Sequence, residues 1–226
     1  MQMKKLTLLL LFLCFGYGAF AQVEIGLMIS PTISSNRFIA DDKYNFDNEN
    51  SNLRLGVGVI ADYFFAQNYA FSTGLLYRSK GGEITYNYTR ENTDGSTTVL
   101  SGKDDIAIQY LELPVTLKLF TNEIAPSTIL YFQVGGSLNT KVAGKVNDKK
   151  IIDGEKTAKR FNVFEADVLL GGGTEFQFGE STKLFAGLTY HRGLSNIDNG
   201  YYEDRLGDDN ISLKNSGVSI DFGVKF

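Results

Sequence analysis

The amino-acid sequence predicts an all-β protein, an eight-stranded antiparallel up-and-down β-barrel that crosses a membrane with its strands. Apolar and polar residues alternate with a period of two in eight separate stretches, the pattern of strands that have one apolar and one polar face. Short and long connections alternate between these stretches, as they do in outer-membrane barrels. The last stretch finishes on Phe226 and needs a partner strand at each edge, which closure of a barrel provides.

Residues 1–21 precede the first strand and have the composition of a secretory signal. Lys4 and Lys5 form its positive start, an apolar run follows, and a small-x-small cleavage site ends at Ala21. We therefore expect a cleaved signal peptide at 1–21 and one barrel domain at 22–226.

The composition argues against several classes of protein. The one cysteine, Cys14, lies within the predicted signal, so we expect a barrel without disulfide bonds. Loss of Lys4 and Lys5 with the signal leaves 20 of the 22 basic residues against 26 acidic ones, a net charge of −6. A chain with this acidic balance lacks the basic surface that nucleic-acid binding requires.

Each strand is predicted from its own alternation. The first, for example, has Val23, Ile25 and Leu27 in its apolar row, and the last has Ile220 and Phe222. We expect these two strands to pair and close the barrel. The eight predicted strands cover about residues 22–33, 53–65, 68–88, 105–120, 127–140, 161–178, 183–192 and 218–226.

The connections differ in length in a regular way. Three are short and lie near residues 66–68, 121–126 and 179–181. In outer-membrane barrels the short turns and both chain ends lie in the periplasm, and the long loops face outward from the cell. We expect the same orientation here. The four long loops cover about residues 34–52, 89–104, 141–160 and 193–210.

The charges of the predicted strands all fall in the polar rows, which places them inside a membrane barrel. A Lys or Arg that faces lipid costs ~2–4 kcal/mol at the middle of the bilayer, so the opposite phase would be expensive. Glycines in the polar rows favour the same phase, because they make room inside a narrow barrel. The predicted interior polar cluster contains Glu24, Arg54, Asp62, Arg78, Glu112, Lys118, Glu165, Asp167, Glu175, Asp221 and Lys225.

Aromatic residues gather near the short turns and predict a girdle at one membrane interface. Eight strands enclose a space that side chains fill, so the interior cluster is expected to be a packed polar plug. The predicted girdle contains Tyr63, Phe64, Phe65, Tyr69, Phe71, Phe120, Phe176, Phe178 and Phe226.

Several motifs resemble one family. Residues 110–115, Tyr-Leu-Glu-Leu-Pro-Val, are followed by Lys118 and resemble the Y-L-E-hydrophobic-P signature of PorT-like outer-membrane β-barrel proteins of the Bacteroidota. The glycines 171–173 and the segment 190–197 look similar too. The resemblance implies the fold and an outer-membrane location, but no reaction.

The same resemblance implies partners. Phe226, with Phe222 and Val224 before it, looks like the signal that the outer-membrane assembly machinery reads. One founding member of the group is tied to a protein secretion system, so a secretion or envelope protein is an implied partner, beside outer-membrane lipid. We expect a non-enzymatic protein that displays its loops for binding or envelope organisation.

Two other functions stay open at this stage. A soluble lipocalin-like carrier of an apolar ligand has the same period, with the apolar rows inside. A lipid A-modifying enzyme would have to use His191, the only histidine. Its Ser195 comes two residues later than in a His-x-Ser-Asn signature, so we predict no catalytic residue. No Cys/His cluster indicates a metal, and no motif indicates a cofactor.

The long loops carry their own patterns. Loop 89–104 is expected to project as an extended hairpin whose edges suit a protein partner. Loop 141–160 is basic and is expected to turn near Asn147 and Asp148, although it could also contact lipid phosphates. Loop 193–210 is acidic, and Ca²⁺ binding there stays open. Its acidic residues are Asp198, Glu203, Asp204, Asp208 and Asp209.

Overall fold

The computed structural model describes residues 23–91, 94–152 and 154–226, so the predicted signal peptide lies outside the described residues. Eight antiparallel strands form a closed ring in the order β6-β4-β3-β1-β12-β11-β10-β7, and β7 pairs again with β6. The strands of the ring are β1 (Val23–Ile39), β3 (Asn52–Ala66), β4 (Tyr69–Lys80), β6 (Thr97–Phe120), β7 (Thr128–Val146), β10 (Phe164–Gln177), β11 (Lys183–Gly193) and β12 (Ser212–Lys225).

The first and last strands close the ring as predicted. β12 pairs with β1 in a register that sets Gly26 opposite Lys225, and it pairs with β11 on its other edge. Beyond the strand, the Phe226 N–H donates to the Ile25 carbonyl at 2.8 Å, and the Ile25 N–H donates back at 3.2 Å. No edge of the ring is left open, which removes the aggregation risk of a free edge.

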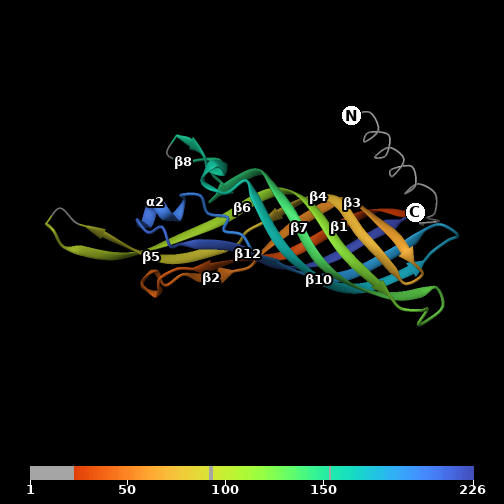
Figure 1. Cartoon of the computed structure of the whole chain (residues 1–226). Helices are drawn as coiled ribbons and strands as arrows, with labels where there is room; N and C mark the ends of the chain where they lie inside the picture. Colours follow the sequence, from red (N-terminus) through yellow and green to blue (C-terminus); the bar gives the residue numbers. More distant parts are fainter. Residues whose placement is uncertain (1–22, 92–93, 153) are drawn as a thin grey trace, which may run out of the picture.

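The two ends of the barrel differ. The short connections 67–68, 121–127 and 178–182 lie with Phe226 at one end, which we call the turn end (Figure 1). The opposite end, the loop end, carries the long excursions. Its elements are β2 (Asp47–Asn50), β5 (Glu83–Glu91), β8 (Ile151–Ile152), β9 (Glu155–Lys156), the 3₁₀ turns η1 (Asp42–Tyr44) and η2 (Thr157–Arg160), and helix α2 (Tyr202–Leu206).

Several strands run further toward the loop end than their apolar pattern predicts. β1 reaches Ile39 instead of residue 33, β7 reaches Val146 instead of 140, and β12 begins at Ser212 instead of 218. In these extensions the backbone ladder continues while the side chains are mixed or polar on both faces. The period-two signal is lost there although the hydrogen bonding is not.

The expected single strand 68–88 is two strands, and this corrects the prediction. β4 ends at Lys80 and β5 begins at Glu83, because Gly81 takes a φ of +124°. A Cβ at Gly81 would lie 2.1 Å from the Ile106 carbonyl oxygen, so a side chain could not occupy this break. β5 then pairs with residues 97–105 of β6, which lengthens β6 well beyond its predicted start.

The β5–β6 hairpin projects from the barrel, as expected for loop 89–104 (Figure 1). At its base β2 pairs with β5, from Asp47 opposite Thr85 to Asn50 opposite Glu83. The hairpin is therefore a continuation of the barrel wall, because β6 belongs to both.

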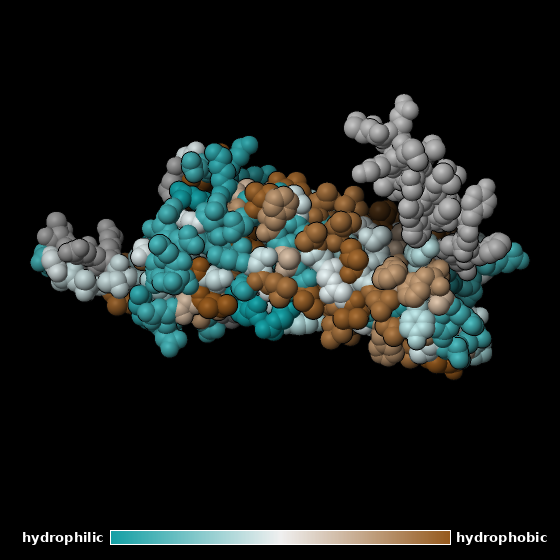
Figure 2. Space-filling view, in the orientation of Figure 1, coloured by the Kyte–Doolittle hydropathy of each residue, from teal (hydrophilic) through white to brown (hydrophobic). Residues whose placement is uncertain are grey.

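The outer surface of the barrel is a band of aliphatic side chains. Leu27, Leu113 and Ile220 are all more than two-fifths exposed, and Leu138 is 65% exposed. Figure 2 shows hydrophobic residues gathered over the barrel and hydrophilic residues over the loop end. Apolar exposure of this extent suits hydrocarbon and not water, and it is the reverse of a soluble carrier barrel. Among the described residues, no α-helix is both long and apolar enough to cross a bilayer.

Two residues of the predicted aromatic girdle point inward instead. Phe120 is buried, and Phe64 packs on it with ring centroids 5.1 Å apart, in a small cluster with Tyr131 and Ala70. Both residues lie at alternate positions whose side chains face the lumen. They were assigned to the girdle because aromatic residues cluster near the short turns in the sequence. The remaining girdle residues are exposed: Tyr63, Phe65, Tyr69, Phe71, Phe176, Phe178 and Phe226.

A hydrophobic core fills the loop end. Side chains from the strand extensions, from β5 and from α2 pack together there, with Tyr202 edge-on to Phe38, Phe46 and Tyr86. We call this group the loop-end core. Its buried members are Tyr44, Ile84, Tyr86, Ile106, Ile108, Tyr110, Val146, Phe161, Ile197, Tyr201, Tyr202, Ile211 and Leu213.

The aliphatic band yields a first prediction. Leu138 lies opposite Leu113, about halfway along the wall. Leu138→Arg should lower the free energy of unfolding in lipid vesicles by ~2–4 kcal/mol, because a lipid-facing Arg is most costly at mid-membrane. Ile151→Arg is the matched control, since Ile151 is equally exposed but lies in β8 at the loop end. Equal losses for the two variants in urea titrations would contradict a membrane-embedded band.

Candidate functional site

The lumen of the barrel holds the charges that the sequence predicts there. All but one of the predicted cluster are buried. Arg54 is the exception: it lies half-buried toward the loop end and donates to Asp105 Oδ1 at 2.7 Å and to the Ile106 carbonyl at 2.9 Å. The buried members are Glu24, Asp62, Arg78, Glu112, Lys118, Glu165, Asp167, Glu175, Asp221 and Lys225.

The buried charges divide into two layers along the barrel axis. In the turn-side layer, Lys225 Nζ lies 2.5 Å from Asp62 Oδ2 and also contacts Glu175, and Lys118 Nζ lies 3.0 Å from Asp62 Oδ2. Lys183 joins from the rim and pairs with Glu24. Three carboxylates therefore face three ammonium groups, and this layer is electrically balanced.

The loop-side layer contains Arg78, Lys80, Glu112, Glu165, Asp167 and Asp221. Arg78 Nε lies 2.9 Å from Glu112 Oε2, and Lys80 contacts Asp167 and lies 3.6 Å from Glu165 Oε2. Asp221 accepts hydrogen bonds from Ser30 at 2.5 Å and from Thr189 at 2.6 Å. Four carboxylates face two cations here, so the layer carries a formal charge of −2.

Lys80 is a lumen residue that the sequence prediction missed. It lies two positions after Arg78 in β4 and therefore on the same strand face. A period of two could have predicted that Lys80 faces the lumen as well. Polar residues without charge were also missed, because they stand out less in a polar row. Among them Asn215 donates to Glu165, and Asn139 donates to Asp167.

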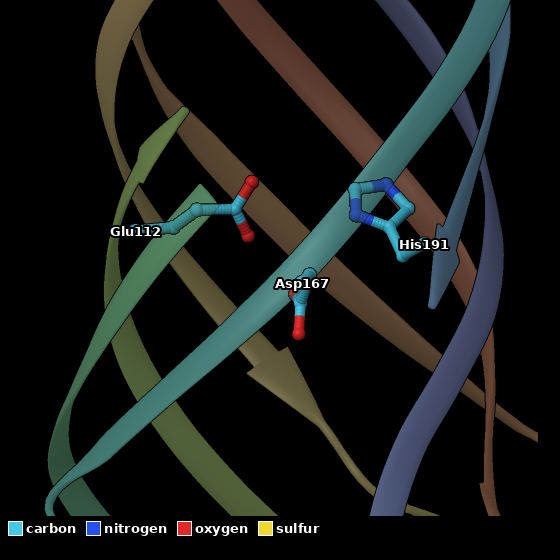
Figure 3. Close-up of side chains that lie close together, drawn as sticks. All are labelled: Glu112, Asp167 and His191. Atoms are coloured by element: carbon cyan, nitrogen blue, oxygen red, sulfur yellow. The ribbon is translucent and has the colours of Figure 1, made fainter. Parts of the chain in front are cut away.

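Three lumen side chains from different strands come together in the loop-side layer. Glu112 of β6, Asp167 of β10 and His191 of β11 each place one ligand atom within 4.8 Å of the other two (Figure 3). Sequence spacing did not predict this group, since its members lie on three different strands and far apart in the chain. Their shared lumen parity was the one available signal.

The lumen has little free space. The cavity beside Arg78, Glu112 and His191 has a volume of about 40 Å³, which is room for a water molecule or two. At the turn end a wide vestibule of about 660 Å³ is lined by residues such as Phe64, Phe120 and Lys183. The two charge layers separate this vestibule from the loop-end core.

The acidic residues of loop 193–210 are dispersed among separate partners in the structure. Asp198 accepts the Tyr202 N–H, Asp204 accepts Arg160 at 2.5 Å, and Asp208 accepts the Tyr44 hydroxyl at 2.9 Å. Each carboxylate thus has a partner of its own. Within the described residues, these carboxylates do not converge as a group of metal ligands.

The basic loop turns where predicted. Asn147 and Asp148 take positive φ values of 51° and 61°, and Val146 and Lys149 form a bridge across the turn. Asn and Asp tolerate this left-handed conformation better than other non-glycine residues. Lys145 pairs with Asp148 at 2.5 Å, and Lys141 donates to the carbonyls of Ala158 and Phe161.

His191 and Ser195 do not contact each other. His191 Nε2 lies 3.0 Å from Ser219 Oγ inside the lumen, whereas Ser195 Oγ accepts the Ala166 N–H at 3.0 Å. The geometry offers no nucleophile and base pair from these two residues.

The described fold is matched by known proteins. A family model for the outer membrane protein beta-barrel domain matches residues 20–199. A search of curated proteins finds no match. Among solved structures, Neisserial surface protein A aligns at 12% identity and a TM-score of 0.49, covering 92% of this chain and all of that one.

Two further structures align in the same way. The outer membrane protein OprG from Pseudomonas aeruginosa aligns at 14% identity and a TM-score of 0.47, over 90% of this chain and 94% of that one. The attachment invasion locus protein Ail of Yersinia pestis aligns at 11% identity and a TM-score of 0.44, over 91% and 99%.

The turn-side layer yields a second prediction. Lys225→Met leaves Asp62 and Glu175 without their shared cation in a buried site, so the free energy of unfolding should fall by roughly 3–5 kcal/mol. Lys145→Met removes a lysine from a solvent-exposed pair and should cost less than about 1 kcal/mol. Urea unfolding of the detergent-folded proteins measures both. A Lys225→Met loss no larger than that of the control would contradict the assigned role of this layer.

The loop-end core yields a third prediction. Asp198 is 2% exposed, and burial raises the pKa of its carboxyl to about 6. A raised folded-state pKa means that stability is complete below about pH 4 and is lost as the pH rises through 6. Asp198→Asn should remove this loss, on the order of 2 kcal/mol, while keeping an acceptor for the Tyr202 N–H. Opening free energies from hydrogen exchange at pH 4 and pH 7 measure it, and an unchanged pH dependence in the variant would contradict it.

Proposed function

The chain belongs to the outer-membrane β-barrel protein family, and from this premise we propose that it is a non-enzymatic barrel that displays its loop end to a protein partner of the cell envelope. The observation that carries the proposal is the β5–β6 hairpin, which extends the wall beyond the barrel as a projecting ribbon. The lumen and the loop end are packed, so binding surface is what the molecule offers.

The hairpin has backbone edges available for pairing. β2 covers the outer edge of β5 only as far as Thr85. On the other side, β7 begins to pair with β6 at Ile106. In the described part of the chain, neither edge of the ribbon beyond these points pairs with another strand. A partner in extended conformation would add a strand here, with main-chain hydrogen bonds as the source of affinity.

The base of the ribbon is held firmly, which favours recognition over random motion. Arg205 of α2 donates to the Tyr86 hydroxyl at 2.8 Å and lies 3.2 Å from Asp104 Oδ2. These contacts connect both strands of the hairpin to the loop-end core. A preorganised ribbon loses less conformational entropy when it binds.

The lumen supports a role other than transport. Two layers of buried charges and the loop-end core lie in series along the barrel axis. An eight-stranded barrel is narrow enough for side chains to fill it, and the 40 Å³ cavity is consistent with that. The separate contacts of His191 and Ser195 support a protein without catalysis.

The orientation follows from the usual habit of the family. We place the turn end and both chain ends in the periplasm and the loop end outside the cell. Phe226, with Phe222 and Val224, would then be presented to the assembly machinery during insertion. The motif at 110–115 supports a PorT-like protein of the Bacteroidota, and with it an accessory role in protein secretion.

The test removes the ribbon and spares the barrel. Replacing residues 88–100 by Asn-Gly joins Asn87 to Ser101, which face each other in the register, through a two-residue turn. Envelope proteins that crosslink to the wild-type protein in native membranes should no longer be recovered with the variant. Heat-modifiable gel migration should show that its barrel is still folded.

The matched control removes the other loop-end hairpin, β8–β9. It should retain the crosslinked partner, because its residues 151–156 do not belong to the ribbon. Recovery of the same partner with the 88–100 replacement would contradict the proposal. Loss of the partner in both variants would do so as well, since the contact would then not be specific to the ribbon.

A further inference from the structure

We propose that Glu112, Asp167 and His191 form a binding site for one divalent transition-metal ion inside the barrel, with Zn²⁺ as the ion that tests it. The site goes beyond the proposed display function and does not depend on it. Imidazole nitrogen and carboxylate oxygen are both ligand atoms that zinc and its neighbours accept. Figure 3 shows the His191 ring facing Glu112 across the lumen, with Asp167 between them.

The hydrogen bonds around His191 fix which ring nitrogen is available. Ser219 Oγ lies 3.4 Å from the Thr189 carbonyl and can donate its proton there, which leaves its lone pairs for the imidazole. We therefore assign the proton to His191 Nε2, which lies 3.0 Å from Ser219 Oγ and would donate to it in this tautomer. Nδ1 is left with a lone pair and has no partner, although the residue is 95% buried. A histidine oriented through its second nitrogen is the usual arrangement of a metal ligand.

The carboxylate of Asp167 is prepared in the same way. Its Oδ2 atom accepts from Lys80, Ser137 and Asn139, which fixes the orientation of the group. Its Oδ1 atom is buried and has no hydrogen-bond partner. An unpartnered carboxylate oxygen in a low-dielectric interior is costly unless a cation or a donor reaches it.

The formal charge of the loop-side layer is of the size that one divalent ion would neutralise. Glu112, Glu165, Asp167 and Asp221 contribute four negative charges, while Arg78 and Lys80 contribute two positive ones. A buried excess of two negative charges is unfavourable, whereas the turn-side layer is balanced. One divalent cation would neutralise the loop-side layer without displacing Arg78 or Lys80. Two bound protons would do so as well, and the experiment separates these cases.

The dimensions suit a metal after a small adjustment. The three ligand atoms lie within 4.8 Å of one another, and tetrahedral zinc with bonds of ~2.0–2.2 Å places its ligands roughly 3.4 Å apart. Rotamer changes of about 1 Å at each side chain close that difference. The adjoining 40 Å³ cavity, lined by Glu112 and His191, has room for a water molecule as the fourth ligand.

The position of the site determines when it can be filled. The loop-end core covers it on one side, and the turn-side layer covers it on the other. An ion therefore enters most readily while the barrel is forming, and its binding free energy adds to that of folding. The experiment consequently supplies the ion during refolding.

The experiment compares metal content with fold. The protein purified from outer membranes is unfolded in urea with EDTA, freed of chelator, refolded in detergent with Zn²⁺, and passed over a desalting column. Elemental analysis should find one zinc per folded chain, and thermal unfolding should occur at a higher temperature than after refolding without zinc. His191→Gln and Asp167→Asn should each lower the zinc content at least tenfold.

The matched control is Glu175→Gln, which removes one buried carboxylate from the turn-side layer and should keep one zinc per chain. Gel mobility reports the folded fraction, and zinc is counted per folded chain. Wild-type protein that folds without retaining zinc would overturn the proposal and favour bound protons. Full zinc retention by His191→Gln would overturn it too. If that variant does not fold, Co²⁺-loaded wild-type protein decides: the visible absorption of a low-coordinate cobalt site is expected, and its absence overturns the proposal.

Discussion

Compensation of buried charge is the constraint on which this structure depends. The outer face of the barrel meets hydrocarbon, so each charge in a strand has to point inward, where water is nearly absent. Lys225 shows the result, since it lies within 4 Å of Asp62, Glu175 and Glu24, carboxylates that come from three other strands. The ring cannot close in another register without separating these groups. Electrostatic pairing inside and apolar exposure outside are thus two aspects of one requirement.

The sequence was sufficient to predict the strands of the barrel wall. It was not sufficient to predict how the lumen is packed or how the loop end is built. Alternation identified the lumen row because a charge such as Asp62 or Glu175 marks its phase in each strand. It could not separate Phe64 and Phe120 from their lipid-facing neighbours, because an aromatic residue suits either the membrane interface or the packed end of a lumen. Alternation also underestimated the lengths of β1, β6 and β12. Their extensions pair through backbone hydrogen bonds but lack the alternation of apolar and polar residues.

The alternation pattern could not predict which lumen residues come close to one another in space. Glu112 was predicted to face inward and His191 was assigned the same face, yet their approach to Asp167 depends on the stagger between strands, which alternation does not report. The charge balance of each layer depends on the same stagger. It also depends on Lys80, which lies at the end of a strand that Gly81 interrupts. A single glycine break thus decides both where the ribbon begins and where the last lumen cation is found.

The interior of the molecule changes along the barrel axis, from polar in the lumen to apolar at the loop end. The barrel is held by hydrogen bonds and ion pairs, and the loop-end core is held by apolar burial around Tyr202 and Ile197. Apolar burial carries a large heat-capacity change and weakens on cooling, whereas polar contacts respond in the opposite sense. The loop end should therefore lose stability on cooling before the wall that supports it. A change of growth temperature should therefore change how rigidly the loop-end core holds the β5–β6 hairpin, while the barrel stays the same.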